Sequence, residues 1–348
     1  MGRFFSVVAA TLLLTLAPMG FVCVGAAEES DSTSPNMTSS AIAPPAPTEA
    51  ITIRFGHFPN ITHAQGVIAH GMSRQGKGWF EGRLGPNVKI EWFVFNAGPT
   101  AMEAFFAKTL DVTYVGPNPA INAHVRSKGE EVRVIAGATN GGAALVVHKG
   151  GAIASPTDFK GKRIATPQFG NTQDISCRAW LGEQGFKVTQ TGGDVFVIPT
   201  ANPDQLGLFQ RGELDGVWTV EPWITRLLTD ADGKIFLEEK DSMTTILAAR
   251  VDFLKSQPDL ARKLAQAHAE LTQWINEHPE EAQKILTDEL NAETKGKMPL
   301  SLAQTAWPRL QFTSDISPEP FNKFLKSAQS VGFLREAGDL SKLVEIPK

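Results

Sequence analysis

Two stretches of the sequence, far apart along the chain, follow the same order of features. The first is GPTAMEAFFAKTLDVTYVGP (98–117), and the second is NPDQLGLFQRGELDGVWTVEP (202–222). Each runs from a proline at a helix start, past a basic residue and a Leu-Asp turn, into a short strand with an aromatic residue and then another proline. Two copies of one unit predict two lobes of related build. Chance convergence on a common helix–turn–strand unit is the alternative.

The rest of the sequence from Ile51 onward alternates between short apolar runs and helical patterns. This alternation is typical of an α/β protein whose parallel sheets carry helices on both faces. From Phe253 onward, apolar residues recur at three- and four-residue spacing, which predicts a helical C-terminal region that packs back on the first lobe. We expect strands at 51–55, 89–95, 112–115, 132–138, 144–148, 163–166, 195–199, 216–220 and 244–249.

Length and composition restrict the class of protein. A chain of 348 residues is long enough for two lobes, because single hydrophobic cores stop growing below that size. A hydrophobic content of 42% and a charged content of 20% are ordinary for a soluble globular protein. The net charge of −4 supplies no basic excess to neutralise phosphates, so we expect no nucleic-acid partner.

The N-terminus has the pattern of a targeting segment. Arg3 precedes an apolar stretch that ends in Gly25-Ala26-Ala27, which predicts a cleaved signal peptide over residues 1–27. An uncleaved membrane anchor is the alternative, because the apolar stretch approaches spanning length. Lipid anchoring at Cys23 also stays open but is not favoured, since Val22 is bulkier than the small residue such a motif prefers. We therefore expect a periplasmic or extracellular protein, with a flexible linker over 28–50 that is rich in Ser, Thr, Pro and Ala.

Catalytic and metal-binding motifs are absent from the sequence. No GxSxG, HExxH, P-loop or GxGxxG pattern occurs. No CxxC spacing occurs, and His63 with His70 makes a poor metal pair without further ligands. Asp111 and Asp215 follow leucines in tight turns, which predicts turn residues rather than catalytic acids. We expect no catalytic residue, no cofactor and no metal site.

Helix starts that follow the predicted strands carry residues that cap helices. Helix N-termini present unpaired N–H groups and a positive dipole end, and ligands of open α/β sheets bind at the carboxyl ends of strands. Corners of this kind in both lobes therefore predict a site for a small anion. The corners are Thr62 with Gln65, Thr100 with Glu103, Asn118 before Pro119, the segment Gly170–Asp174 around Asn171, and Asn202 before Pro203.

Two further segments have more than one interpretation. Gly141 and Gly142 follow a strand, where they would either bring backbone close to a ligand or form a hinge between lobes. Glu221 lies at the end of a second-lobe strand. It would either face the dipole of the next helix or pair with a cationic group of the ligand, while Trp223 covers an apolar part.

At these corners the sequence resembles the nitrate/sulfonate/taurine group of ABC-transporter solute-binding proteins. The resemblance covers roughly residues 51–340. The segments that carry it are GHFPNITHA (56–64), FNAGPTAMEAFFAKTLDVTYVGPNPAINA (95–123), AGATNGGAALVVHKG (136–150), SPTDFKGKRIATPQFGNTQD (155–174), PTANPDQLGLFQRGELDGVWTVEPW (199–223) and VDFLKSQPD (251–259).

The resemblance implies an α/β, two-lobed, periplasmic-binding-protein-like (type II) fold with a helical C-terminal region. Lobe one would take 51–145 and 245–348, and lobe two 146–244. His57 stands where many relatives have an aromatic residue. The implied cleft residues are Asn60, Thr62, His63, Thr100, Asn118, Gly141 and Gly142 from lobe one, and Asn171, Thr172, Gln173, Asn202 and Glu221 from lobe two.

The implied function is the solute-binding component of an ABC importer. The protein would be a monomer that captures a small anionic or zwitterionic ligand, such as an aliphatic sulfonate, taurine or nitrate, and delivers it to the transporter permease. Two alternatives stay open: a pyrimidine-precursor (thiamin-related) binding protein or enzyme of the same fold, and a ligand-sensing module that signals to a membrane partner.

Overall fold

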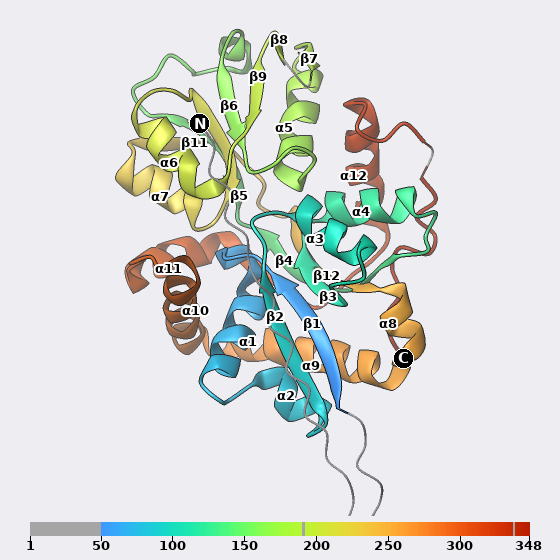
Figure 1. The fold of residues 1–348 in the computed structure, drawn as a ribbon. Coiled ribbons are helices and arrows are strands. Elements are labelled where there is room, and N and C mark those ends of the chain that lie inside the picture. Colours follow the sequence, from blue (N-terminus) through green and yellow to red (C-terminus); the bar gives the residue numbers. More distant parts are fainter. Residues whose placement is uncertain (1–49, 190–191, 337) are drawn as a thin grey trace, which may run out of the picture. The chain divides into compact units, whose positions relative to one another are not determined.

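Two mixed sheets organise the chain in the computed structural model, which describes residues 50–189, 192–336 and 338–348 (Figure 1). The predicted signal peptide, the linker up to residue 49 and Cys23 lie outside these residues. In strand order, the first sheet contains β13 (Leu310–Phe312), β4 (Val132–Gly141), β12 (Met243–Arg250), β3 (Val112–Val115), β1 (Ile51–His57) and β2 (Val88–Val94).

The second sheet is formed by the middle of the chain. In strand order it contains β11 (Gly233–Glu238), β5 (Ala143–His148), β10 (Gly216–Val220), β6 (Arg163–Thr166) and β9 (Phe196–Pro199). A separate small hairpin pairs β7 (Val188–Thr189) with β8 (Gly192–Gly193). The expected strands are all present within a few residues. The expected lobe boundary at 145–146 falls inside β5.

The expectation of purely parallel sheets is wrong for part of each sheet. β1 runs parallel to β2 and β3, and β6 runs parallel to β9 and β10. β12 is antiparallel to both β3 and β4, and β5 is antiparallel to both β10 and β11. The reason lies in the connections between the sheets. β4 carries the chain out of the first sheet and β12 brings it back, so these neighbours run in opposite directions.

Helices cover both faces of the first sheet. Alternate residues of β12 point to opposite faces, so that Leu247 joins one core cluster while Ile246 joins the other. The first cluster includes residues of α1 (Ala64–Arg74), α2 (Trp79–Leu84), α8 (Val251–Ser256), α9 (Pro258–Glu277), α10 (Pro279–Thr294) and α11 (Leu300–Ala306). The second includes residues of α3 (Gly98–Phe106), α4 (Pro117–Arg126) and α12 (Glu319–Ser330).

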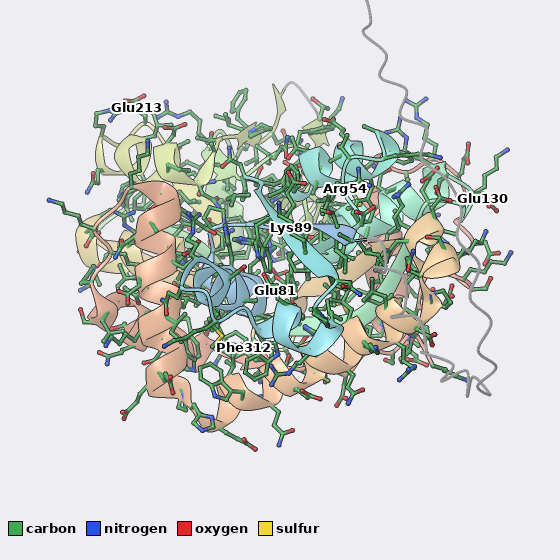
Figure 2. The ribbon with its side chains drawn as sticks, turned by 60° about the horizontal axis from the view of Figure 1, so that its bottom comes forward. Arg54, Glu81, Lys89, Glu130, Glu213 and Phe312 are labelled. Carbon is green, nitrogen blue, oxygen red and sulfur yellow. The ribbon has the colours of Figure 1, made fainter. Side chains whose placement is uncertain are left out.

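The second sheet also has a core on each side. One cluster contains residues of α5 (Thr172–Glu183), and the other contains residues of α6 (Asn202–Gln210) and α7 (Trp223–Asp230). Short 3-10 turns occur at η1 (Ile61–His63), η2 (Pro156–Phe159) and η3 (Trp307–Arg309). Within the described ranges, no helix is long and apolar enough to cross a membrane. Charged side chains such as Glu130 and Glu213 are exposed and lie at the periphery (Figure 2).

The two similar stretches fold in the same way, one in each sheet. In the first, Asp111 precedes β3 and accepts a hydrogen bond from the backbone N–H of Arg54 on β1 (3.0 Å). In the second, Asp215 precedes β10 and accepts one from the backbone N–H of Arg163 on β6 (2.9 Å). Each aspartate N–H also donates back to the carbonyl of the same arginine, at 2.9 Å in both cases. Both residues are therefore turn residues, as the sequence predicts, and the likeness of the two stretches extends to their hydrogen bonds.

Candidate functional site

A buried cavity lies among helix starts that follow strands of both sheets. Its cavity volume is about 30 Å³. Among the described residues, no Lys, Arg, Asp or Glu side chain lines it. The polar lining residues are Asn60, Thr62, His63, Asn96, Asn171, Thr172, Gln173, Asn202, Thr244 and Thr245, and the others are Phe58, Ala97, Gly98, Gly116, Pro119, Pro167 and Val220.

Four helix N-termini contribute to this lining. Gly98 is the first residue of α3, and Gly116 is the residue before α4. Asn171 is the N-cap of α5, and Asn202 is the first residue of α6. The first N–H groups of a helix have no partner within the helix, and the helix dipole places partial positive charge there. The cavity is therefore suited to negative charge although it contains no charged side chain from the described residues.

The start of α5 is held by its own side chains. The Asn171 Oδ1 accepts from the Asp174 N–H (2.9 Å), which is the N-cap bond that the sequence predicts. The Asp174 carboxylate faces inward, where it accepts from the Gly170 N–H (3.0 Å) and the Thr166 hydroxyl (2.9 Å), and it also pairs with Arg178 (3.0 Å). These bonds fix the loop before α5, so that Asn171 reaches the cavity from a rigid support.

Asn60 is fixed by a residue from the other side of the cavity. The Trp223 indole Nε1–H donates to the Asn60 Oδ1 (3.1 Å), and both side chains are buried. An indole N–H can only donate, so the Asn60 oxygen must face it and the Asn60 amide NH₂ is left as a donor. Trp223 itself is not among the lining residues; it acts on the cavity through Asn60.

His63 lines the cavity as a neutral donor. Its Nδ1 accepts a hydrogen bond from the Phe58 N–H (3.3 Å), and its ring stacks on Phe58 at a centroid distance of 4.2 Å. Burial, together with the nearby His57, lowers the pKa of His63 well below its ordinary value. The ring is therefore neutral at pH 7 with its proton on Nε2, which can donate to a bound anion.

Thr172 joins the helix starts of α4 and α5. Its Oγ1 accepts from the Asn118 N–H (3.4 Å), and a Cβ added at Gly116 would overlap this same oxygen. A larger residue at position 116 would therefore force the Thr172 hydroxyl or one of the two helix starts to shift. On the neighbouring strand β12, the Thr245 hydroxyl lines the cavity and is buried without a hydrogen-bond partner among the described residues.

Seven of the predicted site residues line this cavity, and six do not. The seven that do are Asn60, Thr62, His63, Asn171, Thr172, Gln173 and Asn202; the six that do not are Thr100, Asn118, Gly141, Gly142, Glu221 and Trp223. The Thr100 hydroxyl donates back to the Ala97 carbonyl (2.8 Å), and the Asn118 side-chain amide donates to Phe324 (3.2 Å).

Gly141 and Gly142 form the connection between β4 and β5. Their φ angles are +73° and +67°, which favours glycine, and a Cβ on Gly141 would meet the backbone of Arg309. The Gly142 carbonyl accepts from the Glu221 N–H (2.9 Å). The glycines therefore occupy the place where the chain passes from one sheet to the other, in line with the hinge interpretation.

Glu221 is fully buried, and its carboxylate is already engaged. It accepts from the Thr225 N–H (3.1 Å), the Thr225 hydroxyl (2.9 Å) and Arg309 Nη1 (3.1 Å). Burial nevertheless raises the pKa of Glu221 above its ordinary value. The carboxylate thus faces the start of α7 and Arg309, and a role toward a ligand stays a prediction.

Four of the predicted helix caps are wrong. Thr62 lies inside η1 rather than before a helix, and α3 begins at Gly98, which places Thr100 in its first turn. Asn118 and Asn202 are helical residues rather than caps, because α4 begins at Pro117 and α6 begins at Asn202 itself. The prolines occupy early positions, where their missing N–H costs no helical bond. The helix starts themselves are still where the sequence places them.

Four polar or small lining residues, Asn96, Ala97, Thr244 and Thr245, were not predicted from the sequence. Asn96 and Ala97 stand directly before α3, and the position of the helix start could have indicated them. Thr244 and Thr245 lie on β12, whose position beside β3 and β4 depends on pairing between distant strands. No local pattern indicates which residues of such a strand reach the cavity.

Comparison with known proteins gives a consistent group of relatives. The chain is 26% identical over 265 residues to the taurine-binding periplasmic protein of Escherichia coli K12, which covers 72% of this chain and 78% of that protein. The alkanesulfonate-binding protein SsuA of Xanthomonas axonopodis pv. citri, solved with bound MOPS, superposes with a TM-score of 0.69 at 16% identity, covering 86% of this chain and 99% of SsuA. The nitrate-binding protein NrtA of Synechocystis PCC 6803 superposes with a TM-score of 0.60 at 17% identity, covering 83% of each chain.

These likenesses confirm the expected α/β, two-lobed, periplasmic-binding-protein-like fold and the resemblance on which that expectation rests. The model of the NMT1-like family matches residues 46–287, which is more than half of the sequence. The chain therefore belongs to the NMT1-like family.

Proposed function

We propose that this protein is the extracytoplasmic solute-binding component of an ABC importer and that it captures a small organic anion, with an alkanesulfonate as the best fit. The observation that carries the proposal is the cavity itself. Four helix N-termini contribute to its lining, together with neutral donors and no charged side chain from the described residues. Such a lining stabilises an anionic head group through N–H and O–H donors alone.

The remaining lining supports an organic ligand over a bare inorganic ion. Phe58, Pro119, Pro167 and Val220 add apolar surface beside the donors, which suits a short alkyl group. A zwitterion such as taurine also needs an acceptor for its ammonium group. The candidate that the sequence offers, Glu221, does not line the cavity and is engaged by Thr225 and Arg309. This favours a plain alkanesulfonate over taurine, with nitrate as the further anion to test.

The capture step is a closure of two lobes around the ligand. We propose that the chain bends where it passes between the sheets, at Gly141–Gly142 and at 239–242. This moves the predicted lobe boundary at 145–146 to the start of β5, so that the lobes comprise 51–141 with 243–348 and 143–238. Contacts between the two sides support a closed state. They include Trp223 with Asn60 (3.1 Å) and the Asn118 N–H with Thr172 (3.4 Å). Closure would present a surface that the permease recognises.

The partner and location are proposed from the names of the relatives. The taurine-binding relative is described as periplasmic, and one solved neighbour, from Staphylococcus aureus, as the ligand-binding component of an ABC-type import system. We propose by this likeness that the present protein acts outside the cytoplasm as a monomer, after export by the segment 1–27. We propose binding without catalysis on the same ground, because the relatives are described as binding proteins.

A ligand screen tests the proposal directly. Thermal unfolding of the purified protein is followed with ethanesulfonate, taurine, nitrate, bicarbonate and the thiamin pyrimidine, and each hit is titrated calorimetrically. A ligand at 100 times its Kd stabilises the folded state by about 2.7 kcal/mol, which gives a clear rise in Tm. Ethanesulfonate is expected to give the largest rise. A rise with the pyrimidine alone would overturn the ligand class and favour the thiamin-related alternative.

A pair of variants ties the ligand to this cavity. Thr172→Val removes a hydroxyl that lines the cavity and keeps the side-chain shape, so affinity should fall about tenfold or more, as for a lost hydrogen bond to an ion. Thr287→Val makes the same change on α10, where the buried hydroxyl only donates to Gln283 (2.7 Å). The control should bind as the wild type does. Equal binding by both variants would remove the start of α5 from the site.

A further inference from the structure

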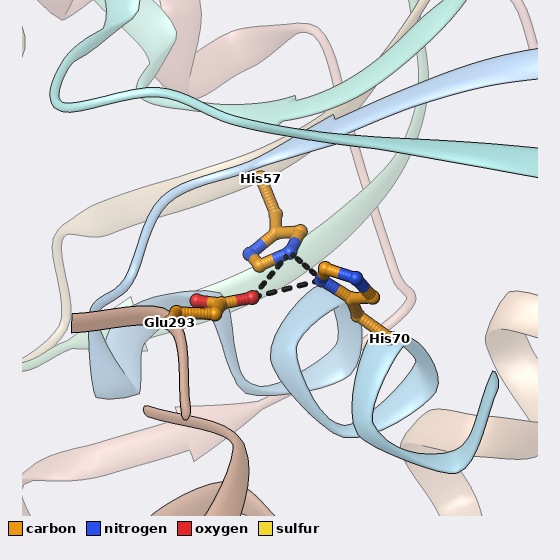
Figure 3. Close-up of side chains that lie close together, drawn as sticks. All are labelled: His57, His70 and Glu293. Carbon is orange, nitrogen blue, oxygen red and sulfur yellow. Dashed lines mark hydrogen bonds and ion pairs between the residues drawn. The ribbon is translucent and has the colours of Figure 1, made fainter. Parts of the chain in front are cut away.

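We propose that His57, His70 and Glu293 form a binding site for a divalent transition metal, best matched by Zn²⁺, which joins α10 to β1 and α1. None of the three residues lines the cavity described above. Along the sequence, His70 has only His63 as a nearby metal-ligand partner, which is why no metal site is expected. The structure pairs His70 instead with His57, at the end of β1, and with Glu293, near the end of α10 (Figure 3).

The three ligand atoms form a nearly equilateral triangle. His57 Nε2 is 3.0 Å from His70 Nδ1 and 3.0 Å from Glu293 Oε1, and His70 Nδ1 is 2.8 Å from the same carboxylate oxygen (Figure 3). All three side chains are buried, with exposed fractions of 0% for His57, 10% for His70 and 1% for Glu293. The atoms converge from three separate elements on one point.

Hydrogen bonds alone cannot satisfy this triangle. Each imidazole nitrogen carries at most one proton, and an ionised carboxylate only accepts. If both nitrogens are protonated and donate to Glu293, two N–H groups face each other across 3.0 Å. If one nitrogen donates to the other, the acceptor has no proton left for the carboxylate. At least one of the three contacts is therefore unfavourable without an ion, whereas a cation accepts a lone pair from each atom.

A zinc ion fits the triangle with little rearrangement. The ligand atoms lie about 1.7 Å from the triangle's centre, so an ion with bonds of 2.0–2.1 Å would sit about 1.2 Å above the plane. Neighbouring ligand atoms in a tetrahedral zinc site are about 3.3 Å apart, so each edge would lengthen by about 0.3–0.5 Å. A water molecule would take the fourth position; the Glu289 Oε1 is 3.3 Å from His70 Nδ1, but it is already paired with Arg74 (2.7 Å).

The surroundings support a metal ligand set. The His57 Nδ1 lies 3.4 Å from the Phe58 carbonyl, which favours a proton on Nδ1 and a lone pair on Nε2. The His70 ring stacks on Trp92, with 14° between the planes, which fixes its orientation. The second oxygen of Glu293 is buried without a hydrogen-bond partner among the described residues. Two imidazoles with one carboxylate suit Zn²⁺ far better than Ca²⁺ or Mg²⁺, which prefer oxygen ligands.

The site would act as a structural clamp. It links the end of β1 to a helix that lies more than two hundred residues later in the chain, so the ion would stabilise the folded state over the unfolded one. Phe58, which lines the cavity, directly follows the ligand His57. The clamp would therefore also fix the start of the segment that carries Asn60 and His63, without contacting the ligand of the cavity.

The test measures metal content and stability in the full-length protein, purified without a histidine tag. After EDTA treatment and dialysis, we expect the protein to take up one Zn²⁺ per chain. Zn²⁺ at 100 times its Kd should raise Tm by about 5 °C, and EDTA should reverse the rise. Glu293→Gln should lose both the stoichiometric ion and the response of Tm to Zn²⁺. Glu281→Gln, an exposed change on the same helix, should keep both.

Three other results would also decide whether His57, His70 and Glu293 bind zinc. If wild-type protein takes up no Zn²⁺ and EDTA leaves Tm unchanged, the proposal is wrong. If Glu293→Gln binds Zn²⁺ as tightly as the wild type, the ion sits elsewhere and the proposal is equally wrong. If Glu293→Gln fails to fold, the X-ray absorption spectrum of zinc-loaded wild-type protein decides: two imidazole ligands support the site, and fewer overturn it.

Discussion

The hydrogen bond from Trp223 to Asn60 gives the sharpest test of ligand capture by closure. The indole Nε1–H and the Asn60 Oδ1 lie 3.1 Å apart, on residues that belong to the two different lobes proposed above. Trp223→Phe keeps an aromatic ring in place and removes only the donor end of the side chain. The variant leaves the buried Asn60 oxygen without this donor. The side-chain NH₂ of Asn60 is then no longer held toward the cavity.

The size of the effect follows from the burial of the bond. A buried acceptor that loses its donor costs about 1–3 kcal/mol. If the bond forms only in the closed state, this cost falls on the closed state alone, and the apparent Kd rises by about 5- to 150-fold. The open protein without ligand does not contain the bond, so its free energy of unfolding should change by less than the about 1–3 kcal/mol lost in binding. Its Tm should therefore stay close to that of the wild type.

Isothermal titration calorimetry with the best ligand of the screen measures the Kd, and differential scanning calorimetry measures the Tm of the free protein. Trp79→Phe is the matched control, because its Nε1–H donates to the Ala267 carbonyl (2.9 Å) between helices that pack on the same sheet. The control should lower Tm and leave the Kd unchanged. If Trp223→Phe behaves like this control, the bond persists in the open protein and the reasoning from closure is wrong.

Three further predictions concern the helix starts, the turns and pH. Gly116→Val would drive a side chain into Thr172 and should weaken ligand binding at least tenfold in calorimetry, while the circular dichroism spectrum stays native. Asp111→Asn should lower the free energy of unfolding in urea more than Asp215→Asn does, because Asp111 is the more buried of the two. Burial alone would raise the pKa of Asp111, but hydrogen bonds from Arg54 and Arg250 outweigh it and lower the pKa. The pKa of Asp111 is lower in the folded state than in the unfolded state. The stability that Asp111 adds is therefore present above pH 4 and is lost as the pH falls through its folded-state pKa. Burial lowers the pKa of His268 to about 4, so stability should fall between pH 6.5 and 4, and His268→Gln should flatten that part of the pH profile.

The sequence predicted much of the local structure because the local signals agree with one another. The repeated helix–turn–strand stretches fold alike, down to the bonds that Asp111 and Asp215 make with the backbone. Gly141 and Gly142 both have positive φ angles, a backbone conformation that few residues other than glycine adopt. The helix starts at 171 and 202 lie at the cavity, as the strand–helix alternation predicts.

The sequence determined by itself that strands and helices alternate and where the helix starts at the cavity lie, since these features depend on spacing along the chain. Tertiary structure alone decided that the sheets are mixed, that Thr244 and Thr245 on β12 reach the cavity, and that Glu221 is engaged by Arg309. It also decided that His57 and His70 meet Glu293. The physical reason is distance in sequence. These contacts join or depend on segments that lie far apart in the sequence, 88 residues apart for Glu221 and Arg309, and no local propensity or period encodes which distant side chains will meet.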